Sequence, residues 1–178
     1  MSALVEYSIP IKGIANGIHQ FDYQIDQQFL QHFEESPITD AAVSVQLELE
    51  KKPGLFVLHF DISGTVKTNC DRCLADIHLP ISGKERLLVK ISTEEESEDP
   101  EVVYLHPEAT RLKVADFIYE FVVLTIPMIK TYECEEEENL PCNEELLDRL
   151  YEAEEPEESE ESDSNPIWDE LKNFKSNQ

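Results

Sequence analysis

The chain reads VSVQLELEKKPGLFVLHFDI from residue 43 to residue 62, and this stretch decides the fold. Apolar and polar residues alternate over residues 43–50 and again over residues 56–62. Alternation with a period of two is typical of a strand that buries one face. Pro53 and Gly54 lie between the two runs and supply a turn. The stretch therefore predicts a β-hairpin.

Further strands and helices follow from the same kind of pattern on either side of the hairpin. Shorter alternating runs predict strands over residues 7–11, 18–25, 77–81, 87–91 and 102–105. A helical period predicts helices over residues 26–34, 114–124 and 143–151, with Asp26 and Asn143 as N-caps. We expect an α+β fold. It contains a mainly antiparallel β-sheet or a partly open barrel, a few helices and a disordered acidic C-terminal segment.

The chain divides into three parts by composition. Residues 1–151 form the β-rich domain with the cysteines and the later helices. Residues 152–165 are almost entirely Glu, Ser, Asp and Pro, which bury too little apolar surface to offset the entropy of ordering. We expect a disordered acidic linker there and a short amphipathic helix over residues 166–175.

Acidic residues are concentrated in the second half of the chain. Its 178 residues carry a formal net charge of −25. Residues 1–92 contain 12 acidic and 8 basic residues, whereas the remainder contains 27 acidic and 6 basic residues. A protein surface with this excess of acidic residues repels nucleic-acid phosphates at long range and attracts basic proteins. An acidic run at residues 135–138 is solvated surface or, as the sharper alternative, a mimic of polyanionic RNA.

No targeting or membrane-spanning pattern is present in the sequence. Residues 1–10 lack the basic region and the apolar stretch of a signal peptide. No apolar run approaches the roughly 20 residues that a membrane helix needs. We therefore expect a cytoplasmic protein without a membrane partner.

Four cysteines form two pairs, Cys70 with Cys73 and Cys134 with Cys142. The first pair has the spacing of a zinc knuckle, and cytosolic cysteine pairs are more often metal ligands than disulfides. The leading interpretation is one structural Zn²⁺ held by all four thiolates, with His78 as a reserve ligand. The alternative is that Cys70 and Cys73 are small buried side chains in a turn.

Basic residues gather near the first cysteine pair in the sequence. On the strands that flank this pair they would form a small basic strip and contact RNA; the alternative is ordinary solvated surface. The candidates are Lys67, Arg72, Lys84 and Arg86.

The end of the chain carries a short apolar helix pattern. Asn165 is a plausible N-cap and Pro166 suits the first helical position. A partner or a groove on the protein's own β domain would cover the apolar face. That face consists of Ile167, Trp168, Leu171 and Phe174.

The order of these segments resembles a known family. The segment Cys70-Asp71-Arg72-Cys73-Leu74 follows a β-rich half, an Asp-led apolar helix at residues 116–128 comes next, and a second cysteine pair follows. The chain ends on Asn-Pro-x-Trp-x-x-Leu at residues 165–171. From about residue 40 onward, the chain resembles the YceD family of bacterial large ribosomal RNA subunit accumulation proteins.

The resemblance implies a role in 23S rRNA processing or accumulation and in large-subunit assembly. We expect a non-enzymatic factor that acts on the large-subunit precursor by binding a basic ribosomal protein or an immature rRNA–protein surface. Phosphate-binding loops and hydrolase motifs are absent from the sequence, so we expect no small-molecule substrate. The alternatives are a zinc-dependent RNA-processing enzyme and a general protein-interaction module.

Overall fold

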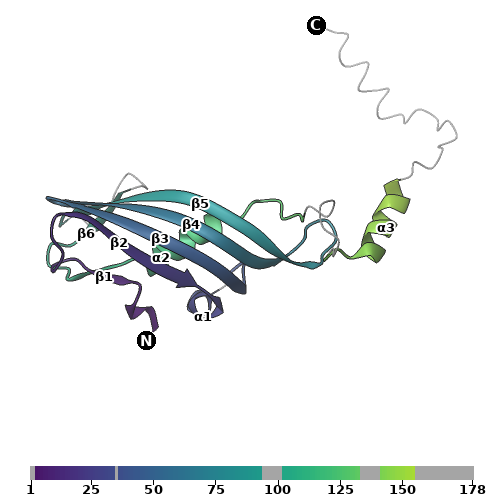
Figure 1. Cartoon of the computed structure of the whole chain (residues 1–178), viewed down its shortest axis with the longest axis horizontal. Coiled ribbons are helices and arrows are strands. Elements are labelled where there is room, and N and C mark those ends of the chain that lie inside the picture. The colour runs from purple at the N-terminus through teal and green to yellow at the C-terminus, as the bar shows by residue number, and fades with distance from the viewer. Residues whose placement is uncertain (1–2, 35, 94–101, 133–140, 155–178) are drawn as a thin grey trace, which may run out of the picture. The chain divides into compact units, whose positions relative to one another are not determined.

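A computed structural model of the chain describes residues 3–34, 36–93, 102–132 and 141–154 (Figure 1). The chain separates into two units, Met1–Cys142 and Asn143–Gln178. The first unit contains both β-sheets, and the second begins with a helix. Over the residues described, no helix is both long enough and apolar enough to cross a membrane.

Five strands form the main sheet of the first unit, in the order β2-β3-β4-β5-β6. β2 to β5 pair antiparallel with their neighbours, whereas β6 runs parallel to β5. A separate two-stranded sheet pairs β1 with β7. The bounds are Ser8–Pro10 (β1), Gly17–Ile25 (β2), Asp40–Lys52 (β3), Leu55–Asn69 (β4), Asp76–Ile91 (β5), Val102–Leu105 (β6) and Arg111–Lys113 (β7). The α+β class is confirmed, with open sheets rather than a closed barrel.

The β3–β4 hairpin is the long central element of the sheet. Lys52 pairs with Leu55, so Pro53 and Gly54 form a two-residue connection. Gly54 has a φ of 75°, which glycine adopts without the steric cost that a side chain brings. The predicted hairpin is therefore confirmed, and its strands extend well beyond the stretch that predicted them.

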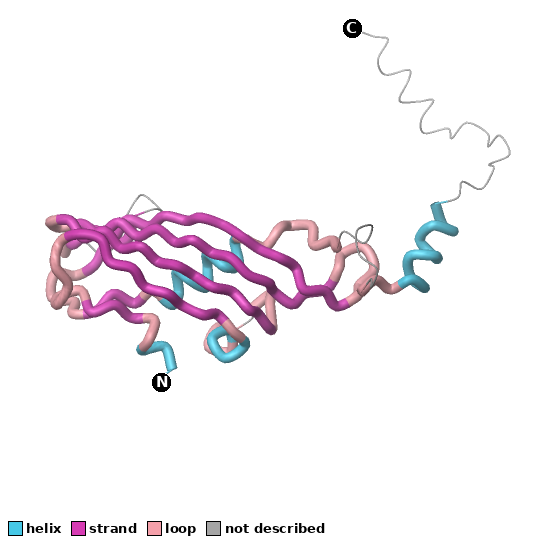
Figure 2. The backbone as a smooth tube through the Cα atoms, viewed as in Figure 1, coloured by secondary structure: helices cyan, strands magenta, loops and turns pink. Residues whose placement is uncertain are grey.

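One face of the main sheet is buried and the other is mostly polar. The buried face carries the alternating apolar residues of β3, β4 and β5, and α2 (Ala115–Leu124) covers part of it, as Figure 2 shows. Ile118 and Val122 of α2 are fully buried, and the ring of Phe121 meets Phe60 edge-on at 5.0 Å. The opposite face carries cross-strand rows of polar residues. One such row is Asp22, Gln46, Asp61 and Lys84.

The first helix is shorter than the sequence predicts. Residues 26–34 were expected to be helical, but α1 spans only Gln27–Leu30, capped by Asp26, whose Oδ1 accepts the Phe29 N–H at 3.0 Å. After Leu30 the backbone tightens: the Phe33 N–H bonds the carbonyl three residues earlier instead of four. The Phe33 ring then stacks on Tyr119 of α2 at 4.0 Å. Tertiary packing thus ends the helix early.

The other predicted elements agree with the structure in type, but the strands expected over residues 77–81 and 87–91 form the single strand β5, and β7 was not predicted. A short 3₁₀ helix, Ala3–Val5, lies near the start of the chain. In the second unit, α3 spans Glu144–Glu154, and Asn143 Oδ1 accepts the Leu146 N–H at 3.3 Å as its cap. α3 thus includes the first residues of the expected linker. The rest of that linker and the helix expected over 166–175 lie outside the described residues.

Candidate functional site

The first cysteine pair lies in a tight turn between β4 and β5. We call residues 70–75 the knuckle. The Cys70 N–H bonds the Ala75 carbonyl at 2.9 Å, and the Leu74 N–H bonds the Cys70 carbonyl at 2.9 Å. Leu74 has a φ of 58°, the single positive value for a non-glycine residue among those described. Asn69 closes the base of the knuckle through its Nδ2, which donates to Asp76 Oδ1 at 2.9 Å.

Hydrogen bonds in the knuckle lower the pKa of the Cys70 thiol. Both thiols are free and buried. Burial by itself would raise the pKa of the Cys70 thiol. Backbone hydrogen bonds from Cys73, Arg72 and Tyr132 and a hydrogen bond from the Cys73 side chain lower this pKa, and the net direction is downward. Thiolates with backbone N–H donors are suited to bind a soft metal ion such as Zn²⁺.

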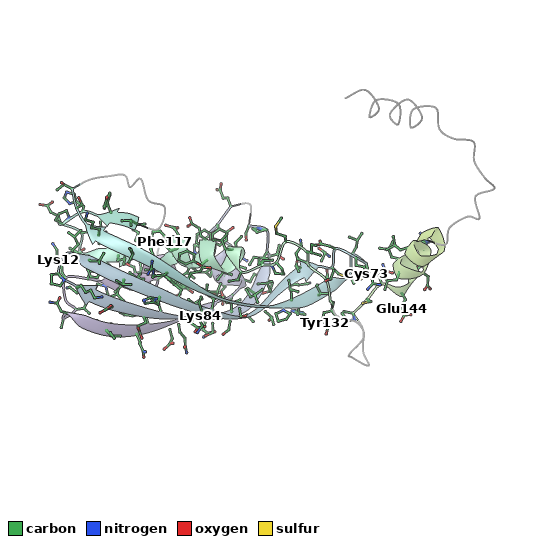
Figure 3. All side chains as sticks on the ribbon, turned by 90° about the horizontal axis from the view of Figure 1, so that it is seen from above. Lys12, Cys73, Lys84, Phe117, Tyr132 and Glu144 are labelled. Carbon is green, nitrogen blue, oxygen red and sulfur yellow. The ribbon has the colours of Figure 1, made fainter. Side chains whose placement is uncertain are left out.

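The chain that follows α2 is fixed against the knuckle. The Asp71 N–H bonds the Lys130 carbonyl at 2.7 Å, and the Lys130 N–H bonds Asp71 Oδ2 at 2.7 Å. The Lys130 Nζ lies 3.6 Å from Asp71 Oδ1. We call this set of contacts the Asp71–Lys130 clamp. Figure 3 shows Tyr132 at the same end of the unit as Cys73. The clamp therefore holds the chain beside the knuckle four residues before Cys134 in the sequence.

The structure positions two of the four predicted zinc ligands together. Cys134 lies outside the described residues. Cys142 is half-buried and disulfide-bonded, so it can bind a metal only after that bond is reduced. No group of three or more metal-ligating side chains occurs within the described ranges. The reserve ligand, His78, is exposed on β5 opposite Lys67.

The four predicted RNA-contact residues lie in two places. Arg72 is in the knuckle, and Lys67 near its base forms an ion pair with Asp76 at 3.2 Å. Lys84 and Arg86 lie farther along β5 on the polar face of the sheet. Lys84 Nζ lies 2.9 Å from Asp61, and this hydrogen bond, with the charge of Asp61, raises the pKa of Lys84. Both lysines thus already have a carboxylate neighbour.

An exposed apolar segment that begins at the last residue of α2 was not predicted as a surface. Leu124, Met128 and Ile129 are 70%, 98% and 72% exposed. A groove of about 220 Å³ runs beside Met128, between this segment, the loop at Pro37 and the end of β4. The sequence pattern indicates only that the helix ends before Pro127, because periodicity does not say which apolar residues lack cover.

A comparison with family models finds a match that spans more than half of the chain. Residues 58–175 match the model described as large ribosomal RNA subunit accumulation protein YceD. Neither the curated proteins nor the solved structures yield a match. The matched part includes most of β4, the knuckle, β5, α2 and α3. The chain belongs to the YceD family of large ribosomal RNA subunit accumulation proteins.

Proposed function

We propose that this protein is a non-enzymatic factor that supports 23S rRNA processing and accumulation, and thereby assembly of the large ribosomal subunit. The family match over residues 58–175 carries this proposal. The factor would bind a basic ribosomal protein or an immature rRNA–protein surface until the 23S rRNA matures. Its site of action would be the cytoplasm, on the precursor of the large subunit.

The charge of the chain supports a basic protein as the direct partner. A net charge of −25 attracts a basic ribosomal protein and repels naked RNA at long range. Ribosomal proteins that have not yet met their rRNA carry uncompensated positive charge, and an acidic binding partner would shield it. Such a partner would be displaced when rRNA phosphates compete for the same basic side chains.

Deletion of the gene, followed by gradient fractionation of the ribosomes, tests the role. Loss of the protein should reduce the large-subunit peak and lead to accumulation of 23S rRNA precursor. An unchanged peak would contradict the role and favour a general interaction module. Incubating the pure protein and metal with precursor rRNA tests the alternative of a zinc-dependent enzyme. Cleavage that requires the protein would overturn the non-enzymatic proposal.

We include a structural Zn²⁺ on Cys70, Cys73, Cys134 and Cys142 in this proposal. The lowered pKa of Cys70 and its backbone N–H donors support a metal at the knuckle. Protein purified under reducing conditions without chelator should contain one equivalent of zinc, and Cys70→Ser should lower both the zinc content and the stability. Fully folded wild-type protein with less than about a tenth of an equivalent would exclude an obligatory site.

A direct RNA contact through Lys67, Arg72, Lys84 and Arg86 is the second part of the proposal to test. The guanidinium of Arg72 suits bidentate phosphate contact. Arg72→Glu with Lys84→Glu should weaken association with pre-ribosomal particles. Lys12→Glu, at the opposite end of the first unit from Cys73 in Figure 3, is the control. Equal co-sedimentation of both proteins across salt concentrations would assign the four residues to ordinary surface.

A further inference from the structure

The outer edge of β2 has no strand beside it in the described part of the chain. β2 begins the strand order of the main sheet and pairs with β3 on its inner side. The Gln24 carbonyl points to the outer edge, because it accepts the Tyr7 hydroxyl at 2.8 Å. Peptide groups alternate in direction along a strand, so those of Ile18, Gln20 and Asp22 point to the same edge. Their backbone N–H and C=O groups are therefore available to a further strand.

This edge lacks the features that normally protect a sheet from pairing with another chain. Proteins shield their edges with very short strands, charged side chains, proline, bulges or a covering segment. On β2, Asp22 is the one Asp, Glu, Lys or Arg side chain, and the Tyr7 hydroxyl covers only the carbonyl of Gln24. β2 has nine residues, contains neither proline nor lysine, and pairs with β3 in an unbroken register. The opposite edge strand, β6, has only four residues. Ile18 at the start of the β2 edge is 62% exposed. A partner strand on β2 would account for this lack of protection.

A negatively charged groove runs along part of this edge. It has a volume of about 430 Å³ and lies between β2, α1 with His32 after it, and the segment that precedes β1. Glu6, Asp22 and Asp26 contribute carboxylates to its lining, and no lysine or arginine lines it. Burial raises the pKa of Tyr7 to about 12, and the charges of Glu6 and Asp26 contribute in the same direction. The groove is thus a place of negative potential beside free backbone groups.

We infer that the outer edge of β2 binds an extended, basic segment of a partner protein as an added strand. The peptide groups of Ile18, Gln20 and Asp22 would bond the partner backbone, and the groove would hold its lysine or arginine side chains. A second copy of this chain is a poorer occupant, because its own Asp22 and Glu6 would meet the same charges. The inference rests on the proposed function in one respect, the basic nature of the partner.

Amide hydrogen exchange on the full-length protein tests the inference. The probe is a short peptide of alternating lysine and valine, and a peptide of alternating glutamate and valine is the control. The lysine peptide should slow exchange at the amides of Ile18, Gln20 and Asp22, and the glutamate peptide should leave them unchanged. Protection elsewhere only, or no binding at about 1 mM peptide, would overturn the inference. Protection of these amides before any peptide is added, together with a dimeric mass, would assign the edge to a second copy.

Two variants separate backbone pairing from charge attraction. Gln20→Pro removes one backbone N–H donor from the outer edge of β2. The pairing of β2 with β3 does not use this donor. Binding of the lysine peptide should therefore be lost, while the spectrum of the residues in β3 to β5 stays unchanged. Asp22→Lys should weaken binding by about tenfold, whereas Glu108→Lys, the same charge change in an exposed turn, should not. Full binding by Gln20→Pro would overturn strand addition. If no variant affects binding but gene deletion still reduces the large subunit, the proposed function survives and this inference fails.

Discussion

Gly64 on β4 lies so close to β3 that the backbone there leaves no room for a side chain. Its φ is 156°, and a Cβ atom at this position would lie 2.6 Å from the Val43 Cα and closer still to the Ala42 carbonyl oxygen. Both neighbours are backbone atoms in the middle of a strand pair, so they cannot move aside singly. Gly64→Ala should therefore destabilise the fold by about 3 kcal/mol or more.

The control for this prediction is Gly13→Ala. A Cβ atom on Gly13 meets nothing within 4 Å, and its φ is not positive. This change should alter the free energy of unfolding by less than about 0.5 kcal/mol. Any increase would come from the lower conformational entropy of the unfolded chain, in which alanine has fewer conformations than glycine. Equal urea midpoints for the two variants would contradict the close approach of β3 and β4 at Gly64.

Tyr7 and Tyr23 predict a loss of stability at alkaline pH. Burial raises the pKa of each hydroxyl from 10.0 to about 12, and Tyr7 adds to the shift at Tyr23. A raised folded-state pKa means that the folded protein binds the proton more tightly than the unfolded chain does. The stabilisation that these raised pKa values contribute is fully present below pH 10 and is lost as the pH rises through about 12.

Tyr23→Phe tests this pH dependence, because it removes one of the two titrating groups. Urea unfolding of the variant should show a shallower decline between pH 10 and pH 12 than unfolding of the wild type. Spectroscopic titration should count one fewer tyrosine with a pKa of about 12. An identical decline in both proteins would show that other groups dominate alkaline unfolding.

The structural roles of single residues were predictable where those roles depend only on neighbours in the sequence. The turn at Pro53 and Gly54 and the caps at Asp26 and Asn143 follow from local chemistry, and each is found. The positive φ of Leu74 was not predictable, because a leucine adopts it only where surrounding contacts impose it. The ion pairs of the basic candidates likewise depend on cross-strand register, which single residues do not reveal.

At the scale of elements, the long periodic segments and the short strands β1 and β6 were predictable, whereas β7 and its pairing with β1 were not. The hairpin of β3 and β4 and the apolar stripe of α2 each repeat their pattern over ten residues or more. β1 and β7 contain three residues each and are separated by about a hundred positions. The three residues of β7 carry too little pattern to identify a strand, and the pairing of β1 with β7 depends on the rest of the fold. α1 was predicted too long because the stacking of Phe33 on Tyr119 is a tertiary contact.

The Asp71–Lys130 clamp gives a prediction about how the knuckle and the chain after α2 depend on one another. Asp71→Ala removes the acceptor of the Lys130 N–H and the partner of the Lys130 ammonium group. A lost hydrogen bond to a carboxylate should cost about 1–2 kcal/mol. Hydrogen exchange of the Lys130 amide should accelerate more than exchange in the centre of the sheet.

Asp61→Ala is the matched control for the clamp. It breaks an exposed ion pair with Lys84 on the polar face of the sheet, and exposed ion pairs contribute little to stability. Exchange of the Lys130 amide should remain as in the wild type. Equal Lys130 exchange in Asp71→Ala and in the wild type would show that the clamp does not hold this segment.

At the scale of the whole molecule, composition predicted the class of the fold better than it predicted the site. Alternation marked the buried face of the sheet, and the order of the segments indicated the family that the match over residues 58–175 shows. The candidate zinc site joins residues far apart in the sequence, and spacing alone cannot tell whether they meet. That β2 lies at the edge of the sheet was not predictable either, because an edge strand has the same sequence pattern as a strand that is paired on both sides.

The C-terminal segment supplies the last prediction, because the family match extends through it to residue 175. Ile167, Trp168, Leu171 and Phe174 recur with helical spacing behind an acidic stretch. A helix this short is marginal in water and should order on contact with a surface. We expect that surface to belong to a large-subunit precursor, which a long tether makes easy to reach.

Trp168 is the sole tryptophan, so its fluorescence reports where the segment binds. The free protein should show the emission of an exposed indole, and large-subunit precursors should shift this emission to the blue. Leu171→Asp should abolish the shift because it places a charge on the apolar face, whereas Asn173→Asp adds the same charge off that face and should preserve it. A tryptophan that is already shielded from quenchers in the isolated protein would instead mean that the segment docks on its own chain.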